Sequence, residues 1–226
     1  MANANKINGA SPVGYLNGAP WTGQARMYAV PVADTTASYA IGDIVSSQSG
    51  SDANGIPYVI KVPAANASNF IALGIVVGIS VADASVSLQA AALDLTQTYI
   101  LSGTRTAVRY VYVADDPNLL FEMSGGTTAT NLTLAKAGYN AGIASWYSAA
   151  DQTLAISQNT YLSPSRPYSN LIISSATVNT TNTLPIRMLG LAQKPDNGVG
   201  AYSRILCRFN SHEFGQGTGT NFTTPS

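Results

Sequence analysis

Acidic side chains gather at one place in the chain, and they are the first candidates for chemistry. Asp115, Asp116 and Glu122 lie close together, whereas the other acids are spread thinly, mostly through turns. Paired carboxylates act as acid and base in glycosidases, and oxygen-rich turns bind calcium. On an extended backbone, however, Asp115 and Asp116 point to opposite faces. We therefore interpret the pair as the cap of a corner, with a catalytic or a calcium-binding pair as the alternatives.

The other reactive side chains lack partners of the required type. His212 is the only histidine, and no Gly-x-Ser-x-Gly motif supplies a nucleophile for it. Cys207 is the only cysteine, which excludes an intramolecular disulfide and a cluster of zinc-binding thiolates. The glycine-rich run at 215–219 has no preceding strand–helix unit of the kind that phosphate loops use. We therefore expect no enzyme activity, no cofactor and no metal, and we expect His212 to be exposed or interfacial.

The composition is typical of a folded protein with an unusually neutral surface. Only 10% of the 226 residues are charged, with eleven basic and eleven acidic side chains, and 46% are hydrophobic. A basic stripe for nucleic acid is missing, and near-zero net charge gives little protection against self-association. The N-terminus lacks the apolar core of a signal peptide, and the apolar stretch 70–82 is too short to span a bilayer. We expect synthesis and folding in a cytoplasm, without a membrane or nucleic-acid partner.

The elements that position these residues are predicted to be strands. The stretch 107–123 combines a β-branched and aromatic run, the corner Asp115-Asp116-Pro117-Asn118 and a second apolar run, and we expect the core to form around it. Further strands are predicted at 26–34, at 39–45 with a bend at Gly42-Asp43, and at 58–62 after a strong turn. The apolar segment 70–81 is predicted to be a fully buried strand.

The second half of the chain is less regular. The best helix candidate is 83–96, and strands are predicted at 99–101 and 184–192 and as short islands within 124–182. From 201 to 209 the alternation is clear, so Ser203, Ile205, Cys207 and Phe209 share a buried face, whereas Arg204 and Arg208 face solvent or a partner. We predict a mainly β fold, an antiparallel β-sandwich or barrel, with few or short helices.

Three parts of the chain follow from this pattern. Residues 1–25 are rich in turns yet carry large apolar groups, which indicates an extended N-terminal arm docked on its own domain or on a neighbour. Residues 26–210 form the β-rich domain, in which 124–182 is a candidate inserted lobe. Residues 211–226 form a Gly/Thr-rich C-terminal tail.

The complete set of strands and turns resembles a family of tailed-bacteriophage virion proteins, the capsid decoration, or cement, proteins of some podovirus-like phages. The resemblance extends from end to end but is patchy, and 124–182 is the least similar part. The residues that carry it are turns and corners: Tyr15-Leu16-Asn17-Gly18-Ala19-Pro20-Trp21, Asp52-Ala53-Asn54-Gly55-Ile56-Pro57, Val113-Ala114-Asp115-Asp116-Pro117 with Phe121-Glu122, Leu189-Gly190-Leu191, Asn197-Gly198-Val199-Gly200-Ala201-Tyr202 and Asn210-Ser211-His212-Glu213-Phe214.

The resemblance implies a structural virion protein without catalytic residues that binds the outer surface of the phage head and bridges capsid subunits. Its partners would be the major capsid protein and further copies of itself, as a dimer or trimer. The alternative is a tail-associated or glycan-binding module that uses the tyrosine and tryptophan side chains. The residues expected at interfaces are Tyr15, Leu16, Trp21, Arg204, Arg208, His212, Phe214 and Phe222.

Overall fold

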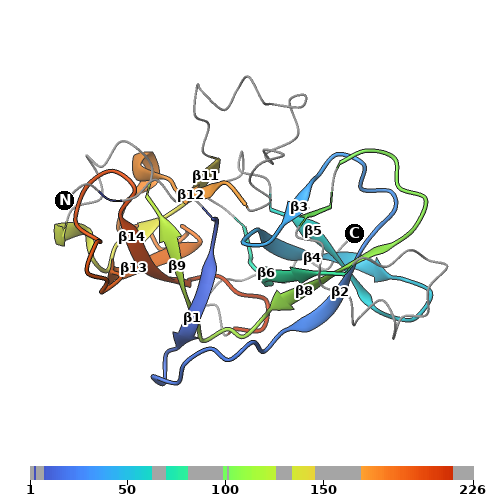
Figure 1. Cartoon of the computed structure of the whole chain (residues 1–226), viewed down its shortest axis with the longest axis horizontal. Helices are drawn as coiled ribbons and strands as arrows, with labels where there is room; N and C mark the ends of the chain where they lie inside the picture. The colour runs from blue at the N-terminus through green and yellow to red at the C-terminus, as the bar shows by residue number, and fades with distance from the viewer. Residues whose placement is uncertain are drawn as a thin grey trace.

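The computed structural model describes Asn3 and residues 8–62, 70–80, 99–100, 102–125, 134–145 and 169–215. Within these ranges the protein is mainly β, and a closed barrel lies beside an open antiparallel sheet (Figure 1). The mainly β prediction is confirmed, and the fold contains a barrel together with a packed sheet. The described helical structure consists of two short 3-10 turns, η3 (Leu134–Lys136) and η5 (Ser175–Thr177). The predicted helix at 83–96 lies outside the described residues.

The barrel is built from five strands, on the right of Figure 1. Its strands, in order around the barrel, are β2 (Arg26–Val30), β5 (Pro57–Lys61), β4 (Ile44–Ser51), β6 (Gly74–Ile79) and β8 (Arg109–Ala114). All neighbours are antiparallel except β2 and β5, which meet in parallel at Ala29 and Tyr58. The β4–β5 pairing makes the strong turn predicted before 58–62 the connection of a hairpin.

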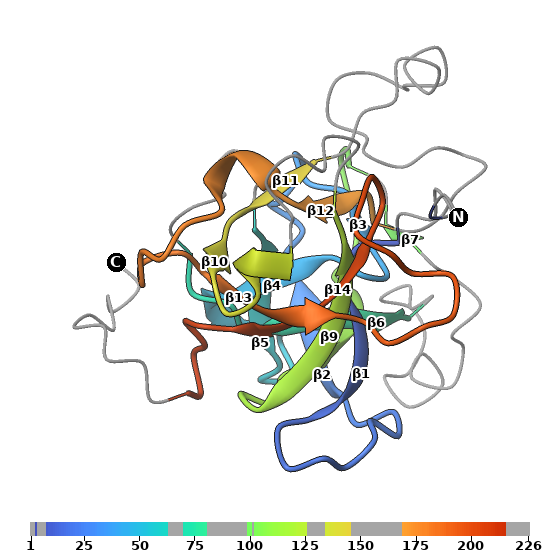
Figure 2. The same ribbon diagram turned by 90° about the vertical axis from the view of Figure 1, so that its left-hand side faces the viewer.

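The open sheet faces the viewer in Figure 2. Its strands, in order, are β1 (Ser11–Tyr15), β9 (Leu119–Ser124), β14 (Arg204–Phe209), β13 (Ile186–Leu191) and β10 (Asn140–Ala141). Two small antiparallel pairs complete the described strands: β3 (Tyr39–Ala40) with β7 (Tyr99–Ile100), and β11 (Ile143–Ser145) with β12 (Leu171–Ile173).

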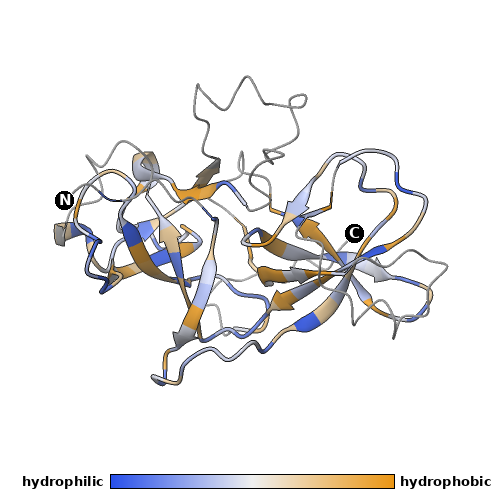
Figure 3. Ribbon diagram, in the orientation of Figure 1, coloured by the Kyte–Doolittle hydropathy of each residue, from blue (hydrophilic) through white to orange (hydrophobic). Residues whose placement is uncertain are grey.

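The sheet and the barrel are joined by a shared core, which explains the continuous apolar runs in the sequence. On β6, Val76 belongs to the core cluster of the barrel, whereas its neighbour Ile75 packs with Phe121 and Phe209 of the sheet. Because successive side chains of a strand point to opposite faces, a strand buried on both faces reads as an unbroken apolar segment. Figure 3 shows this apolar colouring on the strands of both units. The buried strand predicted within 70–81 is confirmed.

Two glycines are required by close backbone approaches. Gly42, at the predicted bend, has φ +92°, and a Cβ there would lie 2.2 Å from the carbonyl oxygen of Asn8. At Gly74 a Cβ would lie 2.3 Å from the carbonyl oxygen of Ala114, where β6 passes β8. No side chain larger than hydrogen fits at either position without movement of the backbone.

The structure draws the boundaries of the units differently from the sequence prediction. Part of the predicted arm is β1, which pairs with β9 along the edge of the sheet and therefore docks on its own chain. The described part of 124–182 contributes Ala141, Ile143 and Leu171 to the core shared with the sheet. Those residues are built into the sheet side of the molecule and do not stand apart as a lobe. The stretch 107–123 does supply core, but β8 belongs to the barrel and β9 to the sheet.

Candidate functional site

Three connections between the sheet and the barrel meet in one region, which we call the junction (Figure 1). It comprises residues 16–25 between β1 and β2 with the adjoining Arg26, residues 115–118 between β8 and β9, and residues 211–215 after β14. The Leu16 N–H donates to the Asn118 carbonyl at 3.0 Å, which ties the first connection to the second. A Cβ on Gly215 would lie 3.5 Å from Pro117, so the third connection also lies against the corner.

The two aspartates of the corner have separate roles. Asp116 is exposed, and its Oδ1 accepts the N–H of Asn118 at 2.7 Å. This is the side-chain-to-backbone bond of an Asx turn, so the predicted cap is confirmed for Asp116. Asp115 is 9% exposed and points the other way, as the extended backbone predicts. The pair therefore does not form a shared carboxylate site.

Asp115 fastens the corner to the first strand of the barrel. Its Oδ2 accepts the Tyr28 hydroxyl at 2.7 Å, and the Arg26 Nε lies 3.5 Å away. Burial of the Tyr28 phenol, together with its hydrogen bond to Asp115, raises the pKa of Tyr28 far above its ordinary value. The phenol therefore stays protonated and donates to the carboxylate throughout the physiological pH range.

The segment 211–215, which we call the clasp, holds the sheet against the barrel. The Ala72 N–H donates to the Ser211 carbonyl at 3.0 Å, and the Glu213 N–H donates to the Ala72 carbonyl at 2.9 Å. The Glu213 carboxylate accepts the N–H of Ser47, on β4, at 2.6 Å and also the Ser47 hydroxyl. The clasp thus extends from β14 of the sheet onto two segments of the barrel side.

His212 is buried inside the clasp, which corrects the expectation of an exposed histidine. It is 6% exposed because its ring packs between Phe209 and Phe214, with centroid distances of 5.9 and 6.1 Å. Its Nδ1 accepts the Phe214 N–H at 3.1 Å, so this nitrogen is occupied by the backbone. Burial lowers the pKa of His212, and the nearby charges of Asp115 and Asp116 oppose that shift only in part. This histidine is a structural member of the clasp.

The turn after β1 is held by its own polar groups. The Tyr15 hydroxyl donates to Gln24 Oε1 at 3.0 Å, and the Trp21 Nε1 donates to the Gln24 carbonyl at 3.2 Å. Both rings are partly buried against the shared core. The Trp21 N–H also donates to the Val13 carbonyl at 3.3 Å, which covers part of the free edge of β1.

Two large apolar side chains of the junction remain in solvent. Leu16 is 44% exposed and Phe214 is 53% exposed. The Arg26 guanidinium lies 5.7 Å from the centre of the Phe214 ring, a cation–π arrangement. We call Leu16, Arg26, Asp116 and Phe214 the junction surface. Apolar groups bordered by one positive and one negative charge on a firmly tethered turn are suited to binding another protein.

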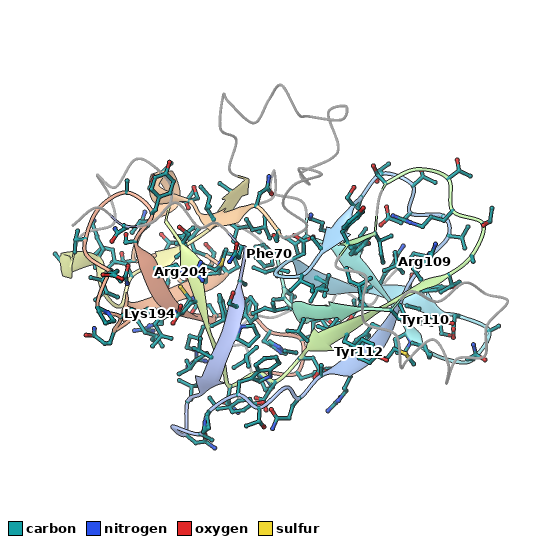
Figure 4. All side chains as sticks on the ribbon, viewed as in Figure 1. Phe70, Arg109, Tyr110, Tyr112, Lys194 and Arg204 are labelled. Atoms are coloured by element: carbon teal, nitrogen blue, oxygen red, sulfur yellow. The ribbon has the colours of Figure 1, made fainter. Side chains whose placement is uncertain are left out.

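The other predicted interface residues lie elsewhere. Arg204 is on the sheet, mostly buried, and its Nε lies 3.7 Å from Glu122, which Lys194 also contacts at 2.5 Å. Figure 4 shows Lys194 and Arg204 together on the sheet side. The Arg208 Nε donates to the Phe209 carbonyl at 3.3 Å. Phe222 lies outside the described residues.

The described residues offer little else for catalysis or metal binding. They contain no group of three or more His, Cys, Asp or Glu side chains placed to hold a metal ion. Cys207 is fully buried, and burial raises the pKa of its thiol. None of the helical turns in these ranges is long and apolar enough to cross a membrane.

Sequence reasoning singled out Leu16 and Phe214 as candidate interface residues but missed the residues that fix the backbone around them. Arg26 and Tyr28 lie in a predicted strand, Gln24 in the predicted arm and Glu213 in the predicted tail. Their partners lie far away in the chain, so local patterns carry no signal for the pairing. Comparison of the chain with protein-family models, curated proteins and solved structures found no match.

Proposed function

We propose that this protein is a structural component of a virion, a decoration protein that attaches to the outer surface of a bacteriophage head and bridges capsid subunits. The observation that carries the proposal is the junction surface. Leu16 and Phe214 come from segments expected at interfaces, and both are exposed on one tethered region. The resemblance of the turn motifs to decoration proteins and the near-neutral composition support the same function.

Attachment to a rigid shell favours a binding surface that is ordered before contact. Pre-organised side chains lose less conformational freedom on binding, so more of the contact energy appears as affinity. The junction meets this requirement because Asp115, Tyr28 and Glu213 fix the backbone that carries Leu16, Arg26 and Phe214. Phe214 and Leu16 would enter apolar depressions between capsid subunits, and Arg26 would pair with an acidic group at the rim.

The glycan-binding alternative has weaker support. An aromatic sugar platform needs an open ring face and polar groups directed to solvent. Trp21 is partly buried against the core, and its N–H is used by the Gln24 carbonyl. We therefore place attachment to the head first.

Co-sedimentation with heads that lack this protein tests the proposal. We expect Leu16→Asp and Phe214→Asp each to weaken binding by about tenfold or more, because a charge would replace an apolar anchor. Val199→Asp is the matched control, since Val199 is 47% exposed and lies in a turn of the sheet away from the junction. Leu16→Asp and Val199→Asp should unfold at temperatures close to that of the unmodified protein, whereas Phe214→Asp uncovers one side of the His212 ring and should unfold at a somewhat lower temperature.

Normal attachment of both junction variants would contradict the proposed surface. Failure of the unmodified protein to bind heads, together with a specific signal on a glycan array, would favour the alternative function.

A further inference from the structure

A second acid–base pair lies buried in the barrel and takes no part in the proposed function. Lys61 is on β5, and Asp43 lies at the bend that leads into β4, the strand that pairs with β5. The Lys61 Nζ is 2.7 Å from Asp43 Oδ2, and their side chains are only 9% and 0% exposed. Removing two charges from water costs free energy, so each polar atom of a buried pair needs a hydrogen-bond partner.

The hydrogen bonds of Asp43 are distributed unevenly between its two oxygens. Oδ2 accepts the Ala40 N–H at 2.8 Å in addition to the Lys61 contact. Oδ1 is buried and has no hydrogen-bond partner among the described residues. A carboxylate that stays ionised needs acceptor bonds on both oxygens, and this site provides them on one.

We propose that Asp43 and Lys61 condense to an intramolecular isopeptide bond. The Lys61 ammonium first passes a proton to the Asp43 carboxylate across the 2.7 Å contact. The neutral amine then attacks Cγ of the carboxylic acid, so that a C–N bond forms and one C–O bond breaks. In the tetrahedral adduct Oδ1 takes one proton from the amine nitrogen and the acid proton from Oδ2. The C–Oδ1 bond then breaks, Oδ1 leaves as water, and Oδ2 becomes the amide carbonyl oxygen, so no oxidant or other reactant is needed.

The site fits the product better than it fits the ion pair. The Asp43 oxygen bonded to the Ala40 N–H would stay as the amide carbonyl, and the oxygen without a partner would be the one expelled. The amide N–H that replaces the ammonium would retain an acceptor, since Lys61 Nζ already donates to the Ser38 carbonyl at 3.0 Å. Condensation thus converts a buried charged pair into a neutral amide whose polar groups are bonded.

The surroundings of the pair are apolar and exclude water. Ile44, Val45, Val59 and Val62, the neighbours of the two residues along the chain and across the hairpin, are 0–2% exposed. A medium that excludes water disfavours charged groups and promotes reaction between groups held in contact. The Lys194–Glu122 pair has a contact of 2.5 Å, but Lys194 is 52% exposed, so the same chemistry is not expected there.

The intact mass of the full-length protein, measured after denaturation, tests this proposal. We expect the unmodified protein to be lighter than its sequence by one water molecule. Proteolysis followed by fragmentation should identify a branched peptide that joins residue 43 to residue 61. Asp43→Asn should lose ammonia in place of water and reach the same final mass as the unmodified protein, because the product amide is identical.

Two controls keep the result specific. Lys61→Arg should have its full sequence mass, because guanidinium is not a comparable nucleophile, whereas Lys194→Arg should retain the loss of one water. A full sequence mass for unmodified protein that unfolds cooperatively would overturn the proposal. So would a water loss that maps to any other position.

Discussion

The protein contains two pairs of an acidic and a basic side chain that differ in burial. In the barrel, Asp43 and Lys61 are both buried, whereas at the junction the Asp115 partner Arg26 has a side chain that is 70% exposed. Full burial makes the barrel pair part of the fold, and neither group is available to another molecule. Exposure at the junction leaves Arg26 able to stack on Phe214 and to meet a partner. The buried pair is therefore suited to stabilising the fold, and the exposed pair is suited to contact with another molecule.

The largest expected difference between the regions is in the unfolding free energy that is lost when the basic side chain, Lys61 or Arg26, is removed. Lys61→Met leaves the Asp43 carboxyl group buried without the partner that it has in either the ion pair or the proposed amide, which should cost about 3–5 kcal/mol of unfolding free energy. Arg26→Met removes an exposed partner and should cost about 0–1 kcal/mol. Denaturant titration of both variants measures the contrast. Equal losses would show that burial does not distinguish the two pairs.

A smaller loss of unfolding free energy is expected when the neutral Tyr28 hydroxyl, which donates to Asp115 at the corner, is removed. Tyr28→Phe leaves Asp115 Oδ2 without its hydroxyl donor, at a cost of about 1–3 kcal/mol. Tyr58→Phe is the matched control, because the Tyr58 hydroxyl has no hydrogen bond within the part of the chain that the structure describes. Thermal unfolding of the two variants makes the comparison. If the control loses as much stability as Tyr28→Phe, the Tyr28–Asp115 bond does not hold the corner.

The two regions should also differ in their response to acid. Burial lowers the folded pKa of His212 below the ordinary histidine value of 6.5, so protonation favours the unfolded chain, and the clasp should lose stability as the pH falls below about 6.5. In the barrel hairpin, burial alone would raise the pKa of Asp52. Hydrogen bonds from Tyr110, Ile56 and Asn54 outweigh the effect of burial, so the pKa of Asp52 lies below its ordinary value of 3.8. The stability that Asp52 contributes is therefore lost only at more acidic pH, as the pH falls through its folded pKa.

Hydrogen exchange measured from pH 7 to pH 3 separates these transitions. Amides of the clasp should lose protection first, and those of the hairpin at 52–57 later. His212→Gln should remove the first transition, and Asp52→Asn should remove the second. A single transition shared by both segments would contradict the assignment of the two groups.

The smallest expected effect is that of the cap. Asp116→Ala removes the acceptor for the Asn118 N–H and should destabilise the protein by about 1 kcal/mol. Asn118→Ala, at an exposed position of the same turn that keeps its backbone N–H, serves as the control in thermal unfolding. A loss as large as that of Tyr28→Phe would mean that Asp116 supports more than its turn.

Local features of this fold could be predicted from the sequence. Alternation from Ser203 to Phe209 correctly identified the buried face of β14, and the dense apolar run at Gly74–Ile79 identified a strand buried on both faces. The turn chemistry of Asp116 and Gly42 located a corner and a bend. These features depend on neighbours in the chain, which the sequence shows directly.

The pairing of segments that are distant in the chain could not be predicted from local sequence patterns. Hydrophobic periodicity tells which face of a strand is buried but not which strand lies beside it, so β8 and β9 could not be assigned to a barrel and a sheet. Asp115 and Tyr28 are brought together by the pairing of β2 with β8, and Asp43 and Lys61 by the pairing of β4 with β5. His212 was misjudged because the polar and glycine-rich sequence around it suggested exposure, whereas Phe209 and Phe214 enclose its ring.

The central claim is that the junction surface attaches this protein to a phage head, and electron cryomicroscopy of heads reconstituted with the purified protein tests it most directly. We expect density on the outer shell, with Leu16 and Phe214 facing capsid subunits and the outer face of the sheet, around Lys194, directed to solvent. Density on the tail, or attachment through the opposite side with the junction in solvent, would contradict the claim.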